Sequence, residues 1–327
     1  MICTGGGAAA APSVRDLWPT YRDRFVKENG RVIDTYNKGV SHSESQGWGL
    51  LLAAAAHDWQ TFDRIWAWTE KYFVWAGAPL FAWRWDLAKR EIPDLNNASD
   101  GDILIAWALL RAGVARKQPA LIARAQESMQ AIKKLLVKTL NQNTVLLPSF
   151  YGYDDGTVVT INLSYYVFPA FWHFDRVDND PIWHRLLNDG AALARVARFG
   201  RNSLPPDWLD VTTEGQLQPA KNWPARFGFD AIRVPLYLFW AGFDSASDLE
   251  VYQYAWRTAD RPPAYFSLDE KPDANHLASD GVLAMRDVVE GRRPAEATLW
   301  SAVQEGEYYT ASLALLALLA AEDRGLR

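Results

Sequence analysis

Apolar residues recur every three to four positions along most of the chain, which predicts a protein built almost entirely of α-helices. Stop signals divide this pattern into twelve segments. No segment predicts a strand with comparable strength, although residues 157–161 are compatible with a short hairpin. The predicted helices span 14–29, 47–57, 60–74, 101–114, 118–139, 165–173, 179–199, 229–242, 246–259, 276–290, 294–302 and 306–322.

The predicted helices fall into six pairs with short links between their members, such as Asp58-Trp59 and Arg116-Lys117. Consecutive helical hairpins of this kind can close into a ring. We expect the second helix of each pair to lie inside it. The longer connections precede the inner helices and should gather on one rim, where a site would form. They span 74–100, 140–164, 200–228 and 261–275.

Helices that are covered on every side should carry almost no charge, and four of the predicted segments meet this condition. They contain 50–56, 103–110, 234–240 and 312–320, whereas 118–139 is amphipathic. No flexible linker or charge block divides the chain, so we expect one domain over 13–327. The small-residue-rich segment 1–12 is expected to be disordered or the remainder of an export signal. We therefore expect the protein to be periplasmic or secreted.

Composition and charge narrow the choice of partner. A net charge of -5 disfavours nucleic acid, which is bound mainly through basic patches. The 16 tryptophans, 13 tyrosines and 14 phenylalanines can fill a helical core, and some can stack on the apolar faces of sugar rings. The most apolar run, 311–321, is shorter than the roughly 20 residues of a membrane-spanning helix. The single cysteine, Cys3, excludes an internal disulfide.

Acidic residues stand at the predicted starts of three apolar helices: Glu44, Asp100 with Asp102, and Asp230. One such residue is commonly a helix cap, but three of them beside small residues favour a cleft. Glycosidic hydrolysis needs one protonated carboxyl and one ionised carboxylate, and inversion needs about 6.5 to 9.5 Å between them. An acid role for Glu44 requires burial or a negative neighbour, for which Asp100 is the candidate.

The segment 98–112, ASDGDILIAWALLRA, closely resembles the signature of glycoside hydrolase family 8. Three further segments occur in the family's order: 43–49 (SESQGWG), 162–165 (NLSY) and 228–235 (GFDAIRVP). This resemblance implies an all-α fold, the (α/α)6 barrel of six helical hairpins with a substrate cleft on one rim. It also implies hydrolysis of a β-1,4-linked polysaccharide without a cofactor.

The resemblance assigns roles to five residues. Glu44 is expected to donate the proton, Asp230 to activate water, and Asp100 to bind and distort the sugar at the cleavage point. Tyr165 is expected to hold the water or the acid–base geometry, and Arg233 to orient a carboxylate or hydroxyl through its planar fork.

Ser45, Trp48 and Leu163 depart from the residues usual in the family and leave substrate detail open. The amino-acid sequences of segments 227–234 and 305–309 are most similar to those of endoglucanases associated with bacterial cellulose synthesis. The expected activity is an inverting endo-β-1,4-glucanase that acts on cellulose or a related glucan, with a possible link to a cellulose synthase complex. The alternatives are a chitosanase, whose polycationic substrate favours acidic subsites, a xylanase, or a non-catalytic cellulose-binding assembly factor.

Aromatic residues near these motifs are candidate sugar platforms. We expect Trp83, Trp85 and Trp107 to stack on sugars, and Trp48 and Asp102 to line the cleft, although Trp107 fits a core position equally well. The five histidines lack the spacing of a metal site, so no catalytic metal is expected.

Overall fold

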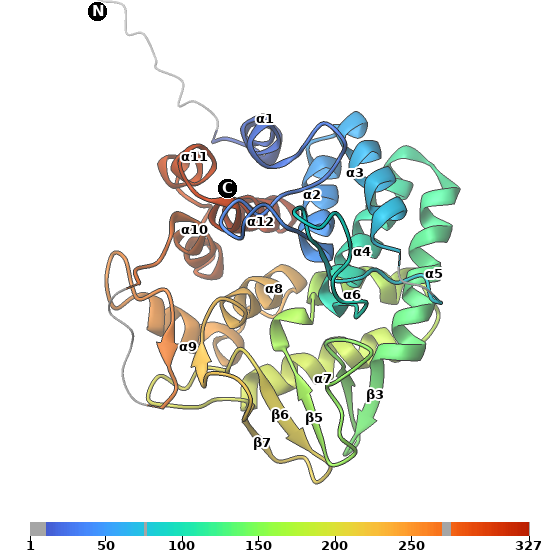
Figure 1. The fold of residues 1–327 in the computed structure, drawn as a ribbon. Helices are drawn as coiled ribbons and strands as arrows, with labels where there is room; N and C mark the ends of the chain where they lie inside the picture. Colours follow the sequence, from blue (N-terminus) through green and yellow to red (C-terminus); the bar gives the residue numbers. More distant parts are fainter. Residues whose placement is uncertain (1–10, 75–76, 270–275, 327) are drawn as a thin grey trace, which may run out of the picture.

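The fold is mainly helical. The computed structural model describes residues 11–74, 77–269 and 276–326. Within these residues there are twelve α-helices, each of which overlaps one of the predicted segments (Figure 1). They are α1 Val14–Phe25, α2 Ser43–Ala55, α3 Trp59–Tyr72, α4 Ser99–Arg116, α5 Pro119–Leu136, α6 Phe168–Val177, α7 Ile182–Val196, α8 Val234–Ala241, α9 Ala246–Trp256, α10 Asp280–Val289, α11 Glu296–Gln304 and α12 Tyr308–Asp323.

The even-numbered helices form a closed inner ring. Each of α2, α4, α6, α8 and α10 contacts the next, and α12 returns to α2. The odd-numbered helices pack around this ring (Figure 1). One hydrophobic cluster includes residues from all twelve helices. The chain is therefore an (α/α)6 barrel, and the predicted fold class is confirmed. The prediction of one domain over 13–327 stays a prediction.

The order within each short-linked hairpin is the reverse of the one expected. The inner helix comes first, as in α2 followed by α3 and α4 followed by α5. A link as short as Lys117-Gln118 can only turn the chain back onto an adjacent antiparallel helix, here from inside to outside. The long connections then lead from an outer helix to the next inner one, as predicted, and reach the opposite rim.

Several predicted helix boundaries were wrong. The segment predicted as one helix over 118–139 leaves helix α5 at Leu136 and continues as strand β3, Val137–Leu140, which pairs with β4, Asn143–Leu146. The turn residues Asn141 and Gln142 both have positive φ, which suits a two-residue hairpin. Helix α1 ends at Phe25, four residues early. Helices α6 and α8 begin later than expected, because the 3-10 turns η1, Leu163–Tyr165, and η2, Ala231–Arg233, precede them.

Short strands tie the long connections together on one rim. Strand β5, Val158–Ile161, was expected within a local hairpin, but it pairs with β6, Leu209–Thr212, which in turn pairs with β7, Leu217–Pro219. Two further pairs join β1, Ser41–His42, to β2, Arg84–Trp85, and β8, Arg226–Phe227, to β9, Phe266–Ser267. Each pair links chain segments that lead into inner helices. The rim that carries the long loops is therefore braced by backbone hydrogen bonds.

Predictions were also made from the sequence about an export segment and about membrane-spanning helices. The segment 1–12 lies outside the described residues except for its last two positions. Along 11–74, 77–269 and 276–326, no helix combines the length and the apolar character needed to cross a bilayer.

Candidate active site

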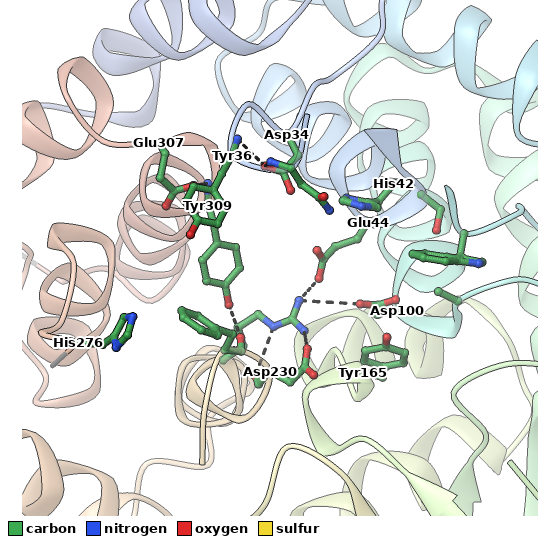
Figure 2. A pocket seen from close by; sticks show the side chains of 16 residues that line it. Asp34, Tyr36, His42, Glu44, Asp100, Tyr165, Asp230, His276, Glu307 and Tyr309 are labelled. Carbon is green, nitrogen blue, oxygen red and sulfur yellow. Dashed lines mark hydrogen bonds and ion pairs between the residues drawn. The ribbon is translucent and has the colours of Figure 1, made fainter. Parts of the chain in front are cut away.

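A cavity of about 620 Å³ opens on the rim where the inner helices begin (Figure 2). Six of the ten predicted site residues line it, namely Glu44, Asp100, Asp230, Tyr165, Arg233 and Trp83. The remaining lining residues are Asp34, Tyr36, Asn37, His42, Ser43, Ala98, Phe229, His276, Glu307 and Tyr309. Segments from both halves of the chain thus contribute to one site.

Glycine lets the first two acidic helix starts approach each other. Glu44 is the second residue of α2 and Asp100 the second residue of α4. A Cβ atom on Gly101 would lie 2.0 Å from the Ser43 hydroxyl oxygen, and one on Gly47 would lie 2.6 Å from the Leu104 Cβ. Larger residues at these two positions would push the helices apart. The close crossing holds Glu44 and Asp100 on the same wall of the cavity.

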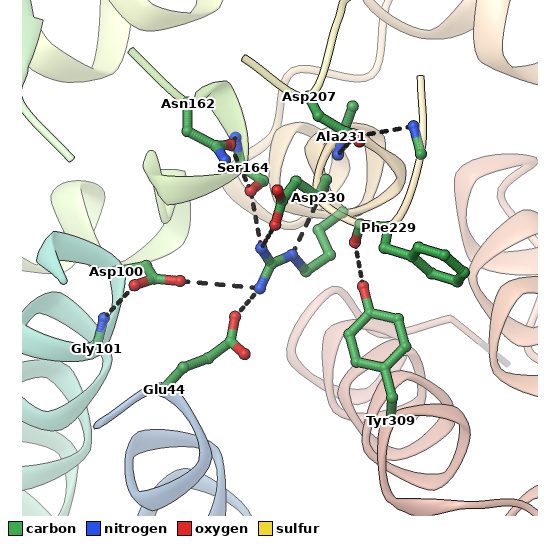
Figure 3. Close-up of polar contacts among 12 residues, drawn as sticks. Glu44, Asp100, Gly101, Asn162, Ser164, Asp207, Phe229, Asp230, Ala231 and Tyr309 are labelled. Carbon is green, nitrogen blue, oxygen red and sulfur yellow. Dashed lines mark hydrogen bonds and ion pairs between the residues drawn. The ribbon is translucent and has the colours of Figure 1, made fainter. Parts of the chain in front are cut away.

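The guanidinium of Arg233 connects Glu44, Asp100 and Asp230, which are labelled in Figure 3. Its Nη1 atom forms an ion pair with Glu44 and lies 3.9 Å from Asp100 Oδ2. Its Nη2 atom donates to Asp230 Oδ1 at 3.0 Å and to the Ser164 hydroxyl at 2.9 Å. The Arg233 side chain is only 3% exposed. One buried cation therefore pairs with two carboxyl groups and lies near a third, and it offsets part of their negative charge.

The buried position of the site changes the pKa of several of its ionisable groups. Burial raises the pKa of Asp100 above its usual range. Burial also raises the pKa of Asp230, and the Asp207 and Asp100 carboxylates add to this effect. Burial raises the pKa of Tyr165 well above its ordinary value, and the Asp100 and Asp230 carboxylates add to this effect. The Tyr165 hydroxyl therefore stays protonated and can donate a hydrogen bond.

Asp100 lies beside Glu44, as the sequence predicted, but the two carboxyls are not simply adjacent. The Arg233 cation reaches both of them. In this arrangement a positive charge contacts Glu44 directly, which favours its ionised form until substrate changes the contacts. The expectation that burial or the Asp100 neighbour favours protonated Glu44 stays a prediction, and Arg233 is a charge of opposite effect that this expectation did not include.

Asp102 does not line the cavity. Its side chain is fully buried, and it accepts hydrogen bonds from the Phe81 N–H and the Asn97 side-chain amide, both at 2.7 Å. These contacts attach the long loop before α4 to the helix itself. Burial raises the pKa of Asp102 to about 8. Asp102 thus supports the wall of the site from behind, and no sugar can contact it in this structure.

Two predicted tryptophans are also sealed in the interior. Trp48 packs against Tyr309 with ring centroids 6.0 Å apart, and the Arg233 guanidinium lies over it at 5.7 Å. Trp107 packs against Trp240 at 5.1 Å. Neither ring has exposed surface. Trp107 occupies the core position that the sequence analysis gave as the alternative. Trp48 packs behind Tyr309 and Arg233, which line the cavity.

Trp83 and Trp85 lie in different environments although they were predicted together. Trp83 lines the cavity and stacks on His42 with an interplanar angle of 5°. Trp85 packs edge-on against Trp68 and lies beneath the Arg31 guanidinium, outside the cavity lining. Only Trp83 is placed to meet a sugar in the cavity.

Several lining residues were not predicted. Glu307 caps α12 by accepting the N–H groups of Tyr309 and Thr310, and the Tyr309 hydroxyl donates to the Phe229 carbonyl. Glu307 was detectable, because it stands at the start of a fourth apolar helix. Asp34 and its neighbours come from an irregular loop, and no local pattern marks them. Among the described residues, no group of His, Cys, Asp and Glu is arranged to hold a metal ion.

An (α/α)6 barrel with several carboxyl groups around one rim cavity is the architecture of a class of polysaccharide-cleaving enzymes. The family model of the glycosyl hydrolases family 8 matches residues 3–323. The chain belongs to this family.

Relatives and solved structures agree with this assignment. A protein named probable endoglucanase from Novacetimonas hansenii is 36% identical, with 100% of this chain and 96% of the relative covered. An endoglucanase from Cellulomonas uda is 38% identical, with 84% of this chain and 77% of the relative covered. The crystal structure of an endoglucanase from Komagataeibacter sucrofermentans superimposes with a TM-score of 0.89 at 36% identity, with 96% of this chain and 99% of that chain covered.

Proposed function

We propose that this protein is an inverting endo-β-1,4-glucanase in which Glu44 is the general acid and Asp230 the general base. The observation that carries the proposal is the position of the two carboxyls. Glu44 and Asp230 lie in one cavity and bind different nitrogens of the same guanidinium, Nη1 and Nη2 of Arg233 (Figure 3). They come from different inner-helix starts and leave open cavity space around them for a sugar. The endoglucanase names of the relatives support the substrate class.

The proposed reaction divides its proton transfers between these two groups. Glu44 gives its proton to the leaving glycosidic oxygen as the bond to the anomeric carbon breaks. Asp230 takes a proton from the water that attacks the opposite face of that carbon. Burial and two negative neighbours make Asp230 a stronger base than an ordinary carboxylate, which suits water activation.

The other lining residues have supporting roles in this proposal. Asp100, which is 3% exposed, binds the hydroxyls of the distorted sugar. Tyr165 donates a hydrogen bond to the water or to Asp230, because its hydroxyl stays protonated. Trp83 supplies an indole face at the cavity wall for a neighbouring sugar ring. No step in this scheme requires a cofactor.

One observation favours a second substrate. Asp34 and Glu307 add two carboxyl groups to the cavity beyond the three around Arg233. A polycationic chain such as chitosan gains more from such groups than a neutral glucan does. Initial rates on carboxymethylcellulose, chitosan and xylan at equal concentration separate the three activities. A preference for chitosan or xylan would replace glucan as the substrate.

The proposal extends to the setting of the enzyme. The sequence resemblance supports secretion or a periplasmic location and a functional association with a cellulose synthase complex. Fractionation of cells that express the full gene would test the location. Copurification with a tagged synthase subunit would test the association.

Product stereochemistry tests the reaction itself. Proton NMR during hydrolysis of cellohexaose should show the α-anomer of the new reducing end first, followed by mutarotation. Initial β-anomer would exclude inversion. Binding of cellulose without turnover by folded protein, at several pH values, would instead indicate the non-catalytic alternative. Glu44→Gln provides the matched inactive control.

A further inference from the structure

Another buried carboxylate, Asp207, lies next to the turn that carries Asp230 (Figure 3). Its Oδ1 atom accepts the N–H of Gly228 at 2.8 Å and the N–H of Ala231 at 2.9 Å. Its Oδ2 atom accepts the Arg226 Nε–H at 3.0 Å. The two amides flank Asp230 in the chain. One carboxylate oxygen therefore clamps the backbone on both sides of the proposed base.

The chain around Asp207 is shaped for this contact. The Asp207 N–H donates to the Arg226 carbonyl at 2.8 Å, so backbone and side chain hold the same segment. A Cβ atom on Gly228 would lie 2.7 Å from Asp207 Oδ2, so glycine permits the carboxylate to come this close. Asp207 is 3% exposed. Burying a carboxylate is costly, and a helix cap at the surface would provide the two hydrogen bonds at a lower cost.

Charged and polar groups face Asp230 from several elements. Asp207, from the loop before β6, and Asp100, at the start of α4, raise the pKa of Asp230. Arg226, from β8, and the Asn162 amide, before η1, lower it. Arg233, in η2, binds its Oδ1 atom.

Other ionisable groups also lie close to Asp230. Tyr165 and Tyr309 line the same cavity, and so does Glu44, which pairs with Arg233. Asp207 and Arg226 form an ion pair that acts electrostatically on Asp230, and neither of them lines the cavity.

We propose that Asp207 is a positioning residue for the general base: it holds the 228–231 turn and keeps a negative charge, balanced by Arg226, beneath Asp230. The inference rests on the proposed function, in which Asp230 activates the water. Asp207 reaches the reaction only through Asp230.

The alternative is that Asp207 only stabilises the turn. Both ideas predict that Asp207→Ala lowers kcat, because two amides lose their acceptor and Asp230 moves. The two ideas make different predictions for a variant that loses the negative charge of residue 207 but keeps a side-chain oxygen that can accept the two N–H groups. In Asp207→Asn the amide oxygen still accepts both N–H groups, whereas the negative charge is absent. Arg226→Gln removes the opposite charge from a side chain that is 35% exposed.

The test is the pH profile of kcat/KM on a soluble cello-oligosaccharide. Removal of the negative charge makes Asp230 ionise more easily, so Asp207→Asn should move the acid limb to lower pH by about half a unit or more. Removal of the positive charge has the opposite sign, so Arg226→Gln should move it to higher pH. Equal losses at all pH values in both variants, without opposite shifts, would overturn the inference.

A matched pair elsewhere in the barrel provides the control. Asp248 is 3% exposed, caps α9 and pairs with Arg195 at 2.6 Å, and it does not line the cavity. Asp248→Asn should leave the acid limb in place. If Asp207→Asn does not fold, the direction of the shift in Arg226→Gln decides. Full activity in Asp230→Asn would defeat the proposed function, whereas an inactive Asp230→Asn with unshifted profiles in the other variants would defeat only this inference.

Discussion

Glu44, near the start of α2, and Arg233, in the turn before α8, form an ion pair inside the cavity. Because Arg233 also binds Asp230 and lies 3.9 Å from Asp100, one cation connects three acidic residues. The proposed acid and base therefore do not respond to substrate independently. A sugar that displaces Glu44 from Arg233 also changes the charge that Asp230 experiences.

Arg233→Gln should remove this connection. Without the cation, three carboxyls repel one another in a buried site, and Glu44 and Asp230 should leave their positions. We expect kcat/KM on carboxymethylcellulose to fall by about 100-fold or more. Arg233→Lys keeps the charge but loses the planar fork, so its loss should be smaller. Wild-type activity in Arg233→Gln would show that the ion pair is not needed.

Glu44→Gln and Asp230→Asn should each lower kcat by about 100- to 10,000-fold, because each keeps its shape and loses one proton-transfer group. Reducing-sugar release measures the loss, and circular dichroism and Tm verify the fold. Glu70→Gln, an exposed change on α3, is the matched control. Near-normal turnover by either variant would remove that residue from its proposed role.

The inner helices could be predicted because a helix covered on every side must be apolar, and that pattern is local in sequence. The acidic residues Glu44, Asp100 and Asp230 were found for the same reason, since each precedes such a segment. Strands β3 and β4 were missed because Val137 and Thr139 also fit the end of an amphipathic helix. Their pairing depends on the turn at 141–142, which the helical period does not reveal.

The positions of Asp102, Trp85 and Asp207 could not be predicted, because they depend on the direction of each side chain and on packing between distant segments. Asp102 follows Asp100 by two positions, which turns a helical side chain by about 200° and directs it to Phe81 instead of the cavity. Trp85 was grouped with Trp83 because the two lie at alternate positions of one rim loop, but Trp85 belongs to the short strand β2 and packs against Trp68 instead of lining the cavity. Asp207 carried no local signal, because its partners lie about twenty positions later in the chain.

Trp83→Ala and Trp85→Ala should have different effects. Trp83 offers its ring to the cavity, so its loss should raise KM for cellohexaose by about tenfold while kcat changes little. Trp85 packs against Trp68 and Arg31, so its loss should lower Tm by about 5 °C with little change in KM. Steady-state kinetics and thermal unfolding of both variants measure these effects. A larger KM effect in Trp85→Ala would reverse the assignment.

Asp102 should make the protein less stable as the pH rises. Burial raises the pKa of Asp102 to about 8 in the folded protein. Between the ordinary carboxyl pKa and pH 8, the folded state keeps a proton that the unfolded state has lost. Stability is therefore greatest below this window and falls as the pH rises through it, with a slope of up to about 1.4 kcal/mol per pH unit from this group.

Comparison of the wild type with Asp102→Asn by urea unfolding between pH 6.5 and 8 isolates this effect, because the other buried acids of the site, Asp100 and Asp230, are present in both proteins. Burial lowers the pKa of His42 to about 4, so its opposite contribution fades as the pH rises past the ordinary histidine pKa near 6.5, and this contribution is common to the wild type and Asp102→Asn. Asp102→Asn cannot ionise, and its slope should be shallower than that of the wild type. The variant should also lose the hydrogen bond from the Asn97 amide, whose oxygen is already bound to the Phe150 N–H, so the slope and not the absolute stability is compared. Equal slopes in the two proteins would show that Asp102 is ionised in the folded state across this range.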